Sequence, residues 1–282
     1  MRSIGICHGE QSVKVSNSHG PSTPPQAASS SSIVSTYKVK LSTGESLVVE
    51  LTWHETISKI TILPSAHDQA ARNHIILREA QGKERLPGSE IEVHWDLTRA
   101  EFGPGPEPIS EFYIMVVVGS EPGLVLGDLG PKPDDLPRKF KLVSRLEFVL
   151  GSSWRSTGVR FSGDGRRHDV SVEFSGGDVS RKSSLSVRVD GKSVVEAKGL
   201  GWNFRGNQTV FLDDGLVVVD LMWDLYGWLF GPVLSGRAVF LFRTRAGLDK
   251  RLWLEVEKNG VKDDDDDFGF SMVVCACKNN PD

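Results

Sequence analysis

The residues with the clearest chemistry of their own are five consecutive aspartates at 263–267. Clustered carboxylates bind calcium, and the candidate metal ligands in this run are Asp263, Asp265 and Asp267. The run does not fit a helix-loop-helix calcium loop, because the sixth position of that loop would be Phe268 instead of glycine and the twelfth would be Val274 instead of glutamate. A calcium site completed by aspartates of other loops is one interpretation, and a solvated, self-repelling loop is the other.

The cysteines, histidines and glycine-rich turns form no recognisable reactive set. Cys275 and Cys277 share one face of a predicted strand, where they would bind a soft metal only with two further ligands; otherwise they are small buried apolar residues. None of the seven histidines has the spacing of four that places two imidazoles on one helix face. The sequence 191–193 resembles the end of a phosphate loop, but Ser186 stands where that loop needs glycine. We therefore expect no catalytic residue, no cofactor and no enzymatic activity.

Composition and charge narrow the class of partner. Of the 282 residues, 39% are hydrophobic and 25% are charged, which is ordinary for a globular chain. A net charge of −4 provides no basic surface for phosphates, which argues against nucleic acid. No stretch approaches the roughly 18 apolar residues of a membrane span, so we expect no transmembrane segment, whereas peripheral membrane contact stays open.

Cysteine use indicates a reducing compartment. Cys7, Cys275 and Cys277 cannot build a disulfide framework, because the last two are too close together and the first lies in a predicted tail. The N-terminus lacks an apolar signal segment, and its Ser-rich start has too few basic residues for a typical transit peptide. We expect an intracellular protein of the cytoplasm or nucleus, with the plastid as the weaker alternative; the sequence leaves the oligomeric state open.

Apolar and polar residues alternate along most of the chain. One segment places on a single face Leu47, Val49, Leu51 and Trp53. The same period of two recurs in 170–174 and 185–189, as in half-buried strands. Asp190-Gly191 and Asp214-Gly215 stand between apolar runs and are typical of two-residue type I′ hairpins. The chain is therefore predicted to be all-β, forming an antiparallel β-sandwich or a partly closed barrel.

A tryptophan-centred repeat predicts two similar halves. Apolar residues and acids alternate around Trp95-Asp96 and again around Trp223-Asp224, an offset of 223 − 95 = 128. Phe-Gly-Pro follows in both copies, and a return strand is predicted from Phe112 and from Phe240 at the same offset. We interpret the pattern as an internal duplication of a strand, a loop and a return strand, with both tryptophans in a core.

The same patterns predict how the chain is divided. Residues 1–35 are poor in apolar side chains and are expected to form a flexible N-terminal tail. A first β unit covers 36–130, a Pro-rich connection covers 131–137, and a second β unit covers 138–282. We expect the two units to pack together as one body.

Several motifs resemble one plant family. Residues 102–108 (FGPGPEP), 187–192 (VRVDGK) and 202–207 (WNFRGN), together with the Trp-Asp-Leu of the repeat, resemble the plant proteins with domain of unknown function 868. The resemblance extends over essentially the whole chain. It implies no activity and no site residue, because the family has no established chemistry to transfer.

The loop predicted to take part in recognition consists of Phe102, Gly103, Pro104, Pro106, Glu107 and Pro108. Its prolines favour an extended course that loses little entropy on binding, although Gly-Pro sequences also shape simple strand crossovers. The leading hypothesis is a non-enzymatic binding or adaptor protein whose partner is a protein. The alternatives are a peripheral lipid- or calcium-dependent membrane-binding protein, and a carbohydrate-recognition module or an enzyme whose site forms only on folding.

Overall fold

The computed structural model describes residues 30–55, 58–64, 73–130, 140–162, 165–175, 183–232, 236–245 and 269–278. Most of these residues lie in strands and few lie in helices, which confirms the all-β prediction. The elements in chain order are β1 (Ser30–Lys40), β2 (Ser46–His54), β3 (Ser58–Pro64), β4 (Asn73–Leu77), β5 (Gln81–Arg85), β6 (Ile91–Asp96), β7 (Glu101–Phe102), β8 (Pro108–Ser110), β9 (Tyr113–Val118), β10 (Glu121–Gly127), β11 (Phe140–Leu150), β12 (Ser153–Arg160), β13 (Arg167–Ser175), β14 (Ser184–Val189), β15 (Lys192–Lys198), β16 (Arg205–Leu212), the 3₁₀ turn η2 (Asp213–Gly215), β17 (Val217–Asp224), α1 (Tyr226–Phe230), β18 (Arg237–Thr244) and β19 (Ser271–Cys277).

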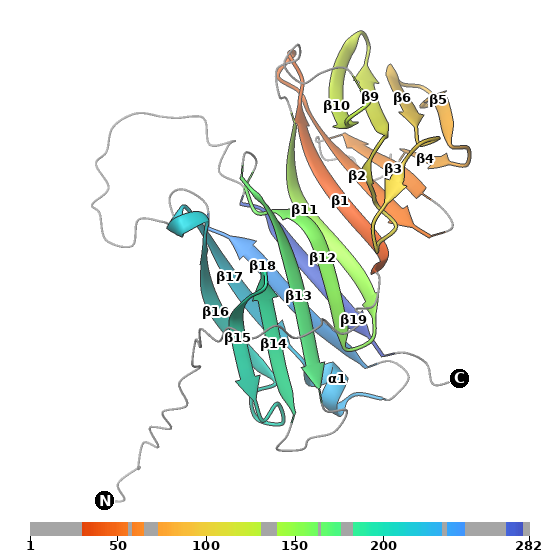
Figure 1. Ribbon diagram of the computed structural model, residues 1–282. Coiled ribbons are helices and arrows are strands. Elements are labelled where there is room, and N and C mark those ends of the chain that lie inside the picture. Colours follow the sequence, from red (N-terminus) through yellow and green to blue (C-terminus); the bar gives the residue numbers. More distant parts are fainter. Residues whose placement is uncertain are drawn as a thin grey trace, which may run out of the picture.

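One long sheet underlies the whole molecule. Its nine strands have the order β16-β17-β18-β19-β11-β1-β2-β3-β4, and two four-stranded sheets, β10-β9-β6-β5 and β12-β13-β14-β15, pack against it (Figure 1). None of these sheets closes into a barrel within the described residues. The result is two sandwiches that share one continuous layer.

Both four-stranded sheets lie on the same face of the nine-stranded sheet. A row of residues paired across that sheet shows this, since all of its side chains point to one side: Trp223, Phe240, Val274, Glu147, Ile33 and Trp53. The first three belong to the core of the second sandwich, whereas Ile33 and Trp53 belong to the core of the first. We call this side the covered face and the opposite side the open face.

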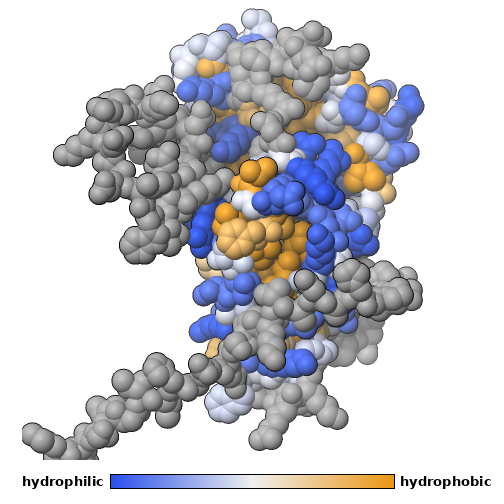
Figure 2. Space-filling view, turned by 60° about the vertical axis from the view of Figure 1, so that its left-hand side comes forward, coloured by the Kyte–Doolittle hydropathy of each residue, from blue (hydrophilic) through white to orange (hydrophobic). Residues whose placement is uncertain are grey.

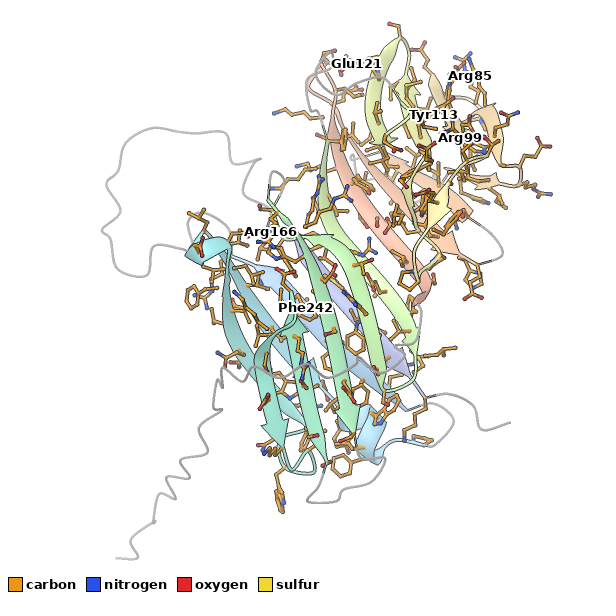
Figure 3. All side chains as sticks on the ribbon, viewed as in Figure 1. Arg85, Arg99, Tyr113, Glu121, Arg166 and Phe242 are labelled. Atoms are coloured by element: carbon orange, nitrogen blue, oxygen red, sulfur yellow. The ribbon has the colours of Figure 1, made fainter. Side chains whose placement is uncertain are left out.

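Each core is built by alternating strands, as the sequence predicts. The burial of β2 alternates perfectly from residue to residue, because its odd-numbered apolar residues face the β10-β9-β6-β5 sheet. In the second sandwich Phe242 of β18 lies between the layers with its ring centroid 6.2 Å from that of Phe161 (Figure 3). These cores stabilise the two sandwiches by removing apolar surface from water.

The two halves meet along β1, β11 and β19. Strand β11 pairs antiparallel with β1 on one side and parallel with β19 on the other. Leu142 of β11 packs against both cores. Strand β1 begins at Ser30 and buries Ile33, so the tail prediction for 1–35 does not hold for its last six residues. The predicted connection 131–137 lies outside the described residues.

The turn predictions differ in outcome. Asp190 and Gly191 join β14 to β15 with φ of 50° and 76°, as a type I′ hairpin requires. Asp214-Gly215 does not form a two-residue hairpin. Instead Asp213, Asp214 and Gly215 all have positive φ, in the 3₁₀ turn η2 between β16 and β17. Two aspartates, which tolerate the left-handed conformation better than most residues, make this longer turn possible.

The two tryptophans of the repeat occupy matching local environments. Trp95 and Trp223 are both buried, and their indole N–H groups donate to the carbonyls of Glu79 at 2.9 Å and Asn203 at 3.2 Å. A glycine on the neighbouring strand faces each ring, Gly82 in one half and Gly206 in the other.

The resemblance between the halves ends after the tryptophan strands. The return strand predicted from Phe112 is present as β9, which begins at Tyr113. Its register differs from that of the second half, because Trp95 pairs with Ile114 and Trp223 with Phe240, so the equal offset of 128 is wrong by two residues. The loop of the first half holds the short strands β7 and β8, and that of the second holds α1. The internal duplication therefore stays a prediction.

Candidate binding surface

The open face of the nine-stranded sheet carries a contiguous group of apolar side chains. Two neighbouring rows of paired residues supply most of them, one running from Met222 to Val34 and the other from Val239 to Phe148. Their side chains are half-buried or exposed, in contrast to the covered face. We call this group the apolar patch; it consists of Val34, Leu146, Phe148, Leu150, Met222, Val239, Leu241, Val273 and Cys275.

The apolar patch arises because its central strands are apolar on both faces. In β19 the buried residues Val274 and Ala276 alternate with the half-buried Val273 and Cys275. Register then aligns β18, β19 and β11 so that Leu241, Val273 and Leu146 stand side by side. Strands that are apolar on both faces ordinarily lie inside a protein, so an apolar row on an open face indicates a contact surface.

Polar residues border the apolar patch. The next row across the sheet includes Asp220, Arg243, Ser271 and Ser144. Asp220 accepts two hydrogen bonds from Arg245, both at 2.8 Å. The hydrogen bond from Arg245 holds the pKa of Asp220 below its ordinary value; partial burial opposes this, and a hydrogen bond from Thr209 at 2.8 Å reinforces it. The patch thus has an apolar centre and a charged rim, as interfaces do.

Asp220→Asn is expected to lower the free energy of unfolding by about 1–2 kcal/mol at neutral pH, because it removes charge-assisted hydrogen bonds. A carboxylate with a depressed folded pKa stabilises the protein fully above its unfolded value of about 3.9, and this contribution disappears as the pH falls through the folded value. The difference between wild type and variant should therefore shrink on acidification. Urea unfolding at a series of pH values measures it, and a pH-independent difference would contradict the assignment.

An aromatic corner adjoins the patch where β16 begins and β17 ends. Rings of Phe204, Tyr226 and Phe230 pack with centroid separations of 5.2–5.8 Å. The guanidinium of Arg205 lies 5.6 Å from the Phe204 ring and 5.4 Å from the Tyr226 ring, and its Nε donates to Asp224 at 2.9 Å. Asp224 is paired in register with Val239 of the patch, so the corner and the patch are continuous.

Exposed apolar surface is visible from the side of the molecule where β16 lies. Figure 2, which brings that side forward, shows a hydrophobic area bordered by hydrophilic residues. Phe211 of β16 and Leu216, which follows η2, are both strongly exposed. The second half therefore exposes apolar side chains outside the apolar patch as well.

The predicted recognition loop is tied to the shared sheet. Phe102 is exposed, but Pro108 is buried, and the carboxylate of Glu107 pairs with Arg145 of β11. Arg145 also binds Glu147 at 2.5 Å, and Glu147 accepts from Ser156 of β12 at 2.5 Å. We call Glu107, Arg145, Glu147 and Ser156 the buried polar cluster. It joins the first sandwich to the second.

Burial and neighbouring charges shift the pKa values of Arg145 and of the adjacent Tyr37. Burial disfavours the charged form of Arg145, but Glu107 and Glu147 outweigh it and raise the pKa of Arg145 above its ordinary value. Burial, assisted by the charge of Glu107, raises the pKa of the neighbouring Tyr37. Sequence reasoning missed this cluster, because Glu107 and Arg145 are 38 positions apart and only the fold brings them together.

A second internal group of polar side chains lies in the second sandwich. His168 of β13 is buried, with Nδ1 2.9 Å from Asp190 and Nε2 3.4 Å from Asp213. Asp190 and Asp213 come from opposite layers of that sandwich. The histidine therefore links the layers.

The remaining predicted residues are placed as follows. Asp96 and Asp224 each accept from the backbone N–H two residues further on, so they shape turns. Cys275 and Cys277 share one face of β19 as predicted, but this is the open face and both residues are only half-buried, so their interpretation as core residues is wrong. Asp263, Asp265 and Asp267 lie outside the described residues. In the described part of the chain no three His, Cys, Asp or Glu side chains are grouped to hold a metal ion.

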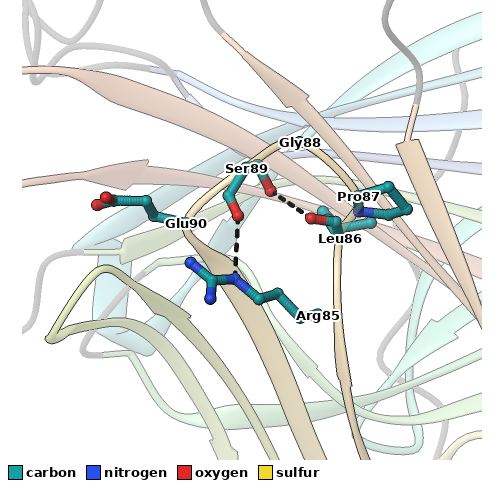
Figure 4. A pocket seen from close by; sticks show the side chains of 6 residues that line it. All are labelled: Arg85, Leu86, Pro87, Gly88, Ser89 and Glu90. Carbon is teal, nitrogen blue, oxygen red and sulfur yellow. Dashed lines mark hydrogen bonds between the residues drawn. The ribbon is translucent and has the colours of Figure 1, made fainter.

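A hollow is found at the turn between β5 and β6. Six consecutive residues, 85–90, line it, and Figure 4 shows Arg85 donating to the Ser89 carbonyl at 3.1 Å and Ser89 donating to the Leu86 carbonyl at 3.1 Å. A ligand site is normally formed by side chains that converge from several elements. This hollow is the surface of a single turn, so the open face is the better candidate for a binding surface.

The fold defines an all-β protein with two sandwiches on one shared sheet, whose open face carries the apolar patch. The chain belongs to the family described as plant protein of unknown function (DUF868), whose model matches residues 28–278, as the sequence motifs indicate. No curated protein and no solved structure was found to match it. None of the helices in the described part of the chain has the length and apolar character needed to span a bilayer.

Proposed function

We propose that the chain is a non-enzymatic protein-binding module that contacts its partner through the apolar patch. The observation that supports this is the alignment of apolar side chains from β17, β18, β19, β11 and β1 on the open face. A continuous apolar area inside a polar rim matches the composition of protein interfaces.

The charged groups of the described residues support binding more than chemistry. Arg145 is engaged by Glu107 and Glu147, and His168 lies between two aspartates, so these groups are used within the fold. The exposed side chains of the patch offer contact area and hydrophobic burial instead. A partner that covers them gains free energy in proportion to the apolar area removed from water.

The test compares two variants in plant cells by proximity labelling. Met222→Glu with Val239→Glu puts charges at two patch positions that are 40% and 38% exposed, so the fold should tolerate them. Ile109→Glu is the matched control, since Ile109 is an exposed apolar residue of β8 away from the open face. We expect at least one partner to be lost only in the patch variant, and the purified partner to bind wild type and Ile109→Glu equally.

Two outcomes would contradict this function. One is an unchanged set of labelled proteins in the patch variant with an unchanged melting curve. The other is a wild-type dimer in analytical ultracentrifugation that dissociates on Met222→Glu with Val239→Glu, because the patch would then serve self-association.

A further inference from the structure

Strand β16 forms one edge of the nine-stranded sheet, at the margin of the second sandwich (Figure 1). It pairs with β17 over its whole length, from Arg205 to Leu212, without a bulge. In the described part of the chain no strand pairs with its other side. An edge strand of this length presents a row of main-chain N–H and C=O groups to which a further strand can be added.

The hydrogen-bond pattern shows which residues carry the outward groups. Leu225 donates to the Phe204 carbonyl at 2.7 Å, and these two residues continue the register of β16 and β17. Because hydrogen-bonded and non-hydrogen-bonded pairs alternate along antiparallel strands, the even-numbered residues of β16 direct their main-chain groups to β17. The main-chain groups of the odd-numbered residues therefore point away from β17; these residues are Arg205, Asn207, Thr209 and Phe211.

A side chain of β16 itself reaches one of these outward groups. Nε2 of Gln208 donates to the Thr209 carbonyl at 3.1 Å. That carbonyl points away from β17, so the amide stands where an added strand would place a main-chain N–H. The outward carbonyl is thus within reach of a donor, and a second strand would replace the amide there.

β16 lacks the features that keep the other edge strands from pairing. In the four-stranded sheets, β10 contains Pro122 and a bulge, β12 contains a bulge, and β5 and β15 carry lysines. At the other edge of the nine-stranded sheet, β4 is only five residues long. β16 has no proline, lysine or bulge, and its one charged residue, Arg205, stands at its start. An edge of this kind readily pairs with another strand.

The residues of β16 are complementary to those of a second β16. When two copies pair antiparallel about a twofold axis at Gln208, Arg205 stands opposite Phe211 and Asn207 stands opposite Thr209. A guanidinium against an aromatic ring is attractive, and an amide can hydrogen-bond a hydroxyl across the strands. The two Arg205 side chains lie at opposite ends of the pairing, so like charges do not meet. Moving the axis by one residue leaves either Arg205 or Phe211 opposite a residue outside β16.

We propose that the chain forms a symmetric homodimer by antiparallel pairing of β16 with β16 of a second copy. The two nine-stranded sheets then become one continuous sheet. Both open faces lie on the same side of it, because paired residues point to the same face. The twofold pairing occupies the β16 edge of both copies, so this contact stops at the dimer. The proposal does not rest on the apolar patch, whose residues lie on other strands.

Sedimentation velocity of the full chain at about 1–100 μM tests the proposal. We expect a dimer that Asn207→Pro weakens about tenfold or more, because proline removes an outward N–H and leaves the hydrogen bonds to β17 in place. Asn207→Ser keeps that N–H and is the matched control, so it should dimerise like wild type. Melting curves check that both variants are folded.

Charges at position 211 test the register without a proline. Phe211 is 68% exposed, so the fold should tolerate Phe211→Lys, which puts a cation opposite Arg205 of the other copy and should weaken the dimer about tenfold or more. Phe211→Glu puts a carboxylate opposite Arg205 and should keep the dimer. Leu216→Lys is the matched control, since Leu216 is 75% exposed but follows η2 and lies outside β16, and it should dimerise like wild type.

Three results would overturn the proposal. The first is a wild type that is still monomeric at about 100 μM. The second is a dimer that Asn207→Pro and Phe211→Lys leave intact, or that the two control variants weaken equally. The third is a dimer that dissociates on Met222→Glu with Val239→Glu but not on the β16 variants, because the interface would then be the open face. Whether that patch variant loses a labelled partner is a separate result and bears only on the proposed function.

Discussion

Trp223→Ala should lower the free energy of unfolding by about 3–5 kcal/mol, the range for removing a large aromatic from a core. Trp223 is 5% exposed, packs in the core of the second sandwich and donates its indole N–H to Asn203. Urea unfolding measures the loss. A value below about 1 kcal/mol would place Trp223 outside the core, against its burial here.

The glycine that faces Trp223 gives a control for this prediction. A Cβ at Gly206 would lie within 2.1 Å of the Trp223 ring, so Gly206→Ala in the wild type should cost about 1–3 kcal/mol through overpacking. In the Trp223→Ala background the same change should cost much less, because the ring is gone. Equal costs in both backgrounds would mean that Gly206 is required for its backbone and not for the ring.

Trp95→Ala is the equivalent change in the first half. Trp95 has the same hydrogen bond to a carbonyl, and Gly82 faces its ring with a Cβ position 2.5 Å away. Both tryptophans thus pack over a glycine of the neighbouring strand and donate their indole N–H to a backbone carbonyl. A comparable loss of stability in both variants would support the duplication that their sequence spacing suggests.

Local features of the fold could be predicted from the sequence. Alternation in residues 47–53 indicates a half-buried strand, and Asp190-Gly191 indicates a hairpin, because both signals depend on neighbouring residues. The register of the return strands could not be derived in this way. Trp95 pairs with Ile114 and Trp223 pairs with Phe240, and the loops between the paired strands differ in structure in the two halves. The paired residues are therefore not separated by the offset of 128 that relates the tryptophans.

The shared sheet was not predictable, because its central pairings join distant segments. Strand β11 pairs with β1, about a hundred residues before it, and with β19, more than a hundred residues after it. One signal was present in the sequence: residues 272–276 are apolar without interruption, which indicates a strand with two apolar faces. That signal points to the open face, although it does not say which strands lie beside it.

The predicted recognition loop forms an ion pair with Arg145 that the sequence did not predict. Glu107 was predicted as a recognition residue because it lies among prolines, yet its carboxylate faces inward to Arg145. The loop is thereby attached to the sheet that both sandwiches share. Its exposed part is Phe102 and the residues next to it, while its acidic residue serves the junction.

Arg145→Met is expected to destabilise the protein by about 3–5 kcal/mol, since removing one partner of a buried ion pair leaves its counter-charges uncompensated. Two carboxylates, Glu107 and Glu147, would then lie close together with little access to water, as Glu147 is only 1% exposed. Without the guanidinium between them, the two like charges would repel each other. Urea unfolding at neutral pH measures the loss of stability.

Neutral replacements separate the charge effect from lost packing. In the Arg145→Met background, Glu107→Gln with Glu147→Gln removes both uncompensated charges, and Ser156 still donates to the oxygen of the new amide at position 147. The triple variant should therefore recover a large part of the lost stability, because a neutral buried cluster is often as stable as an ion pair. If it recovers nothing, the guanidinium of Arg145 stabilises the junction of the two sandwiches by its shape and contacts, and the buried carboxylates do not require its charge.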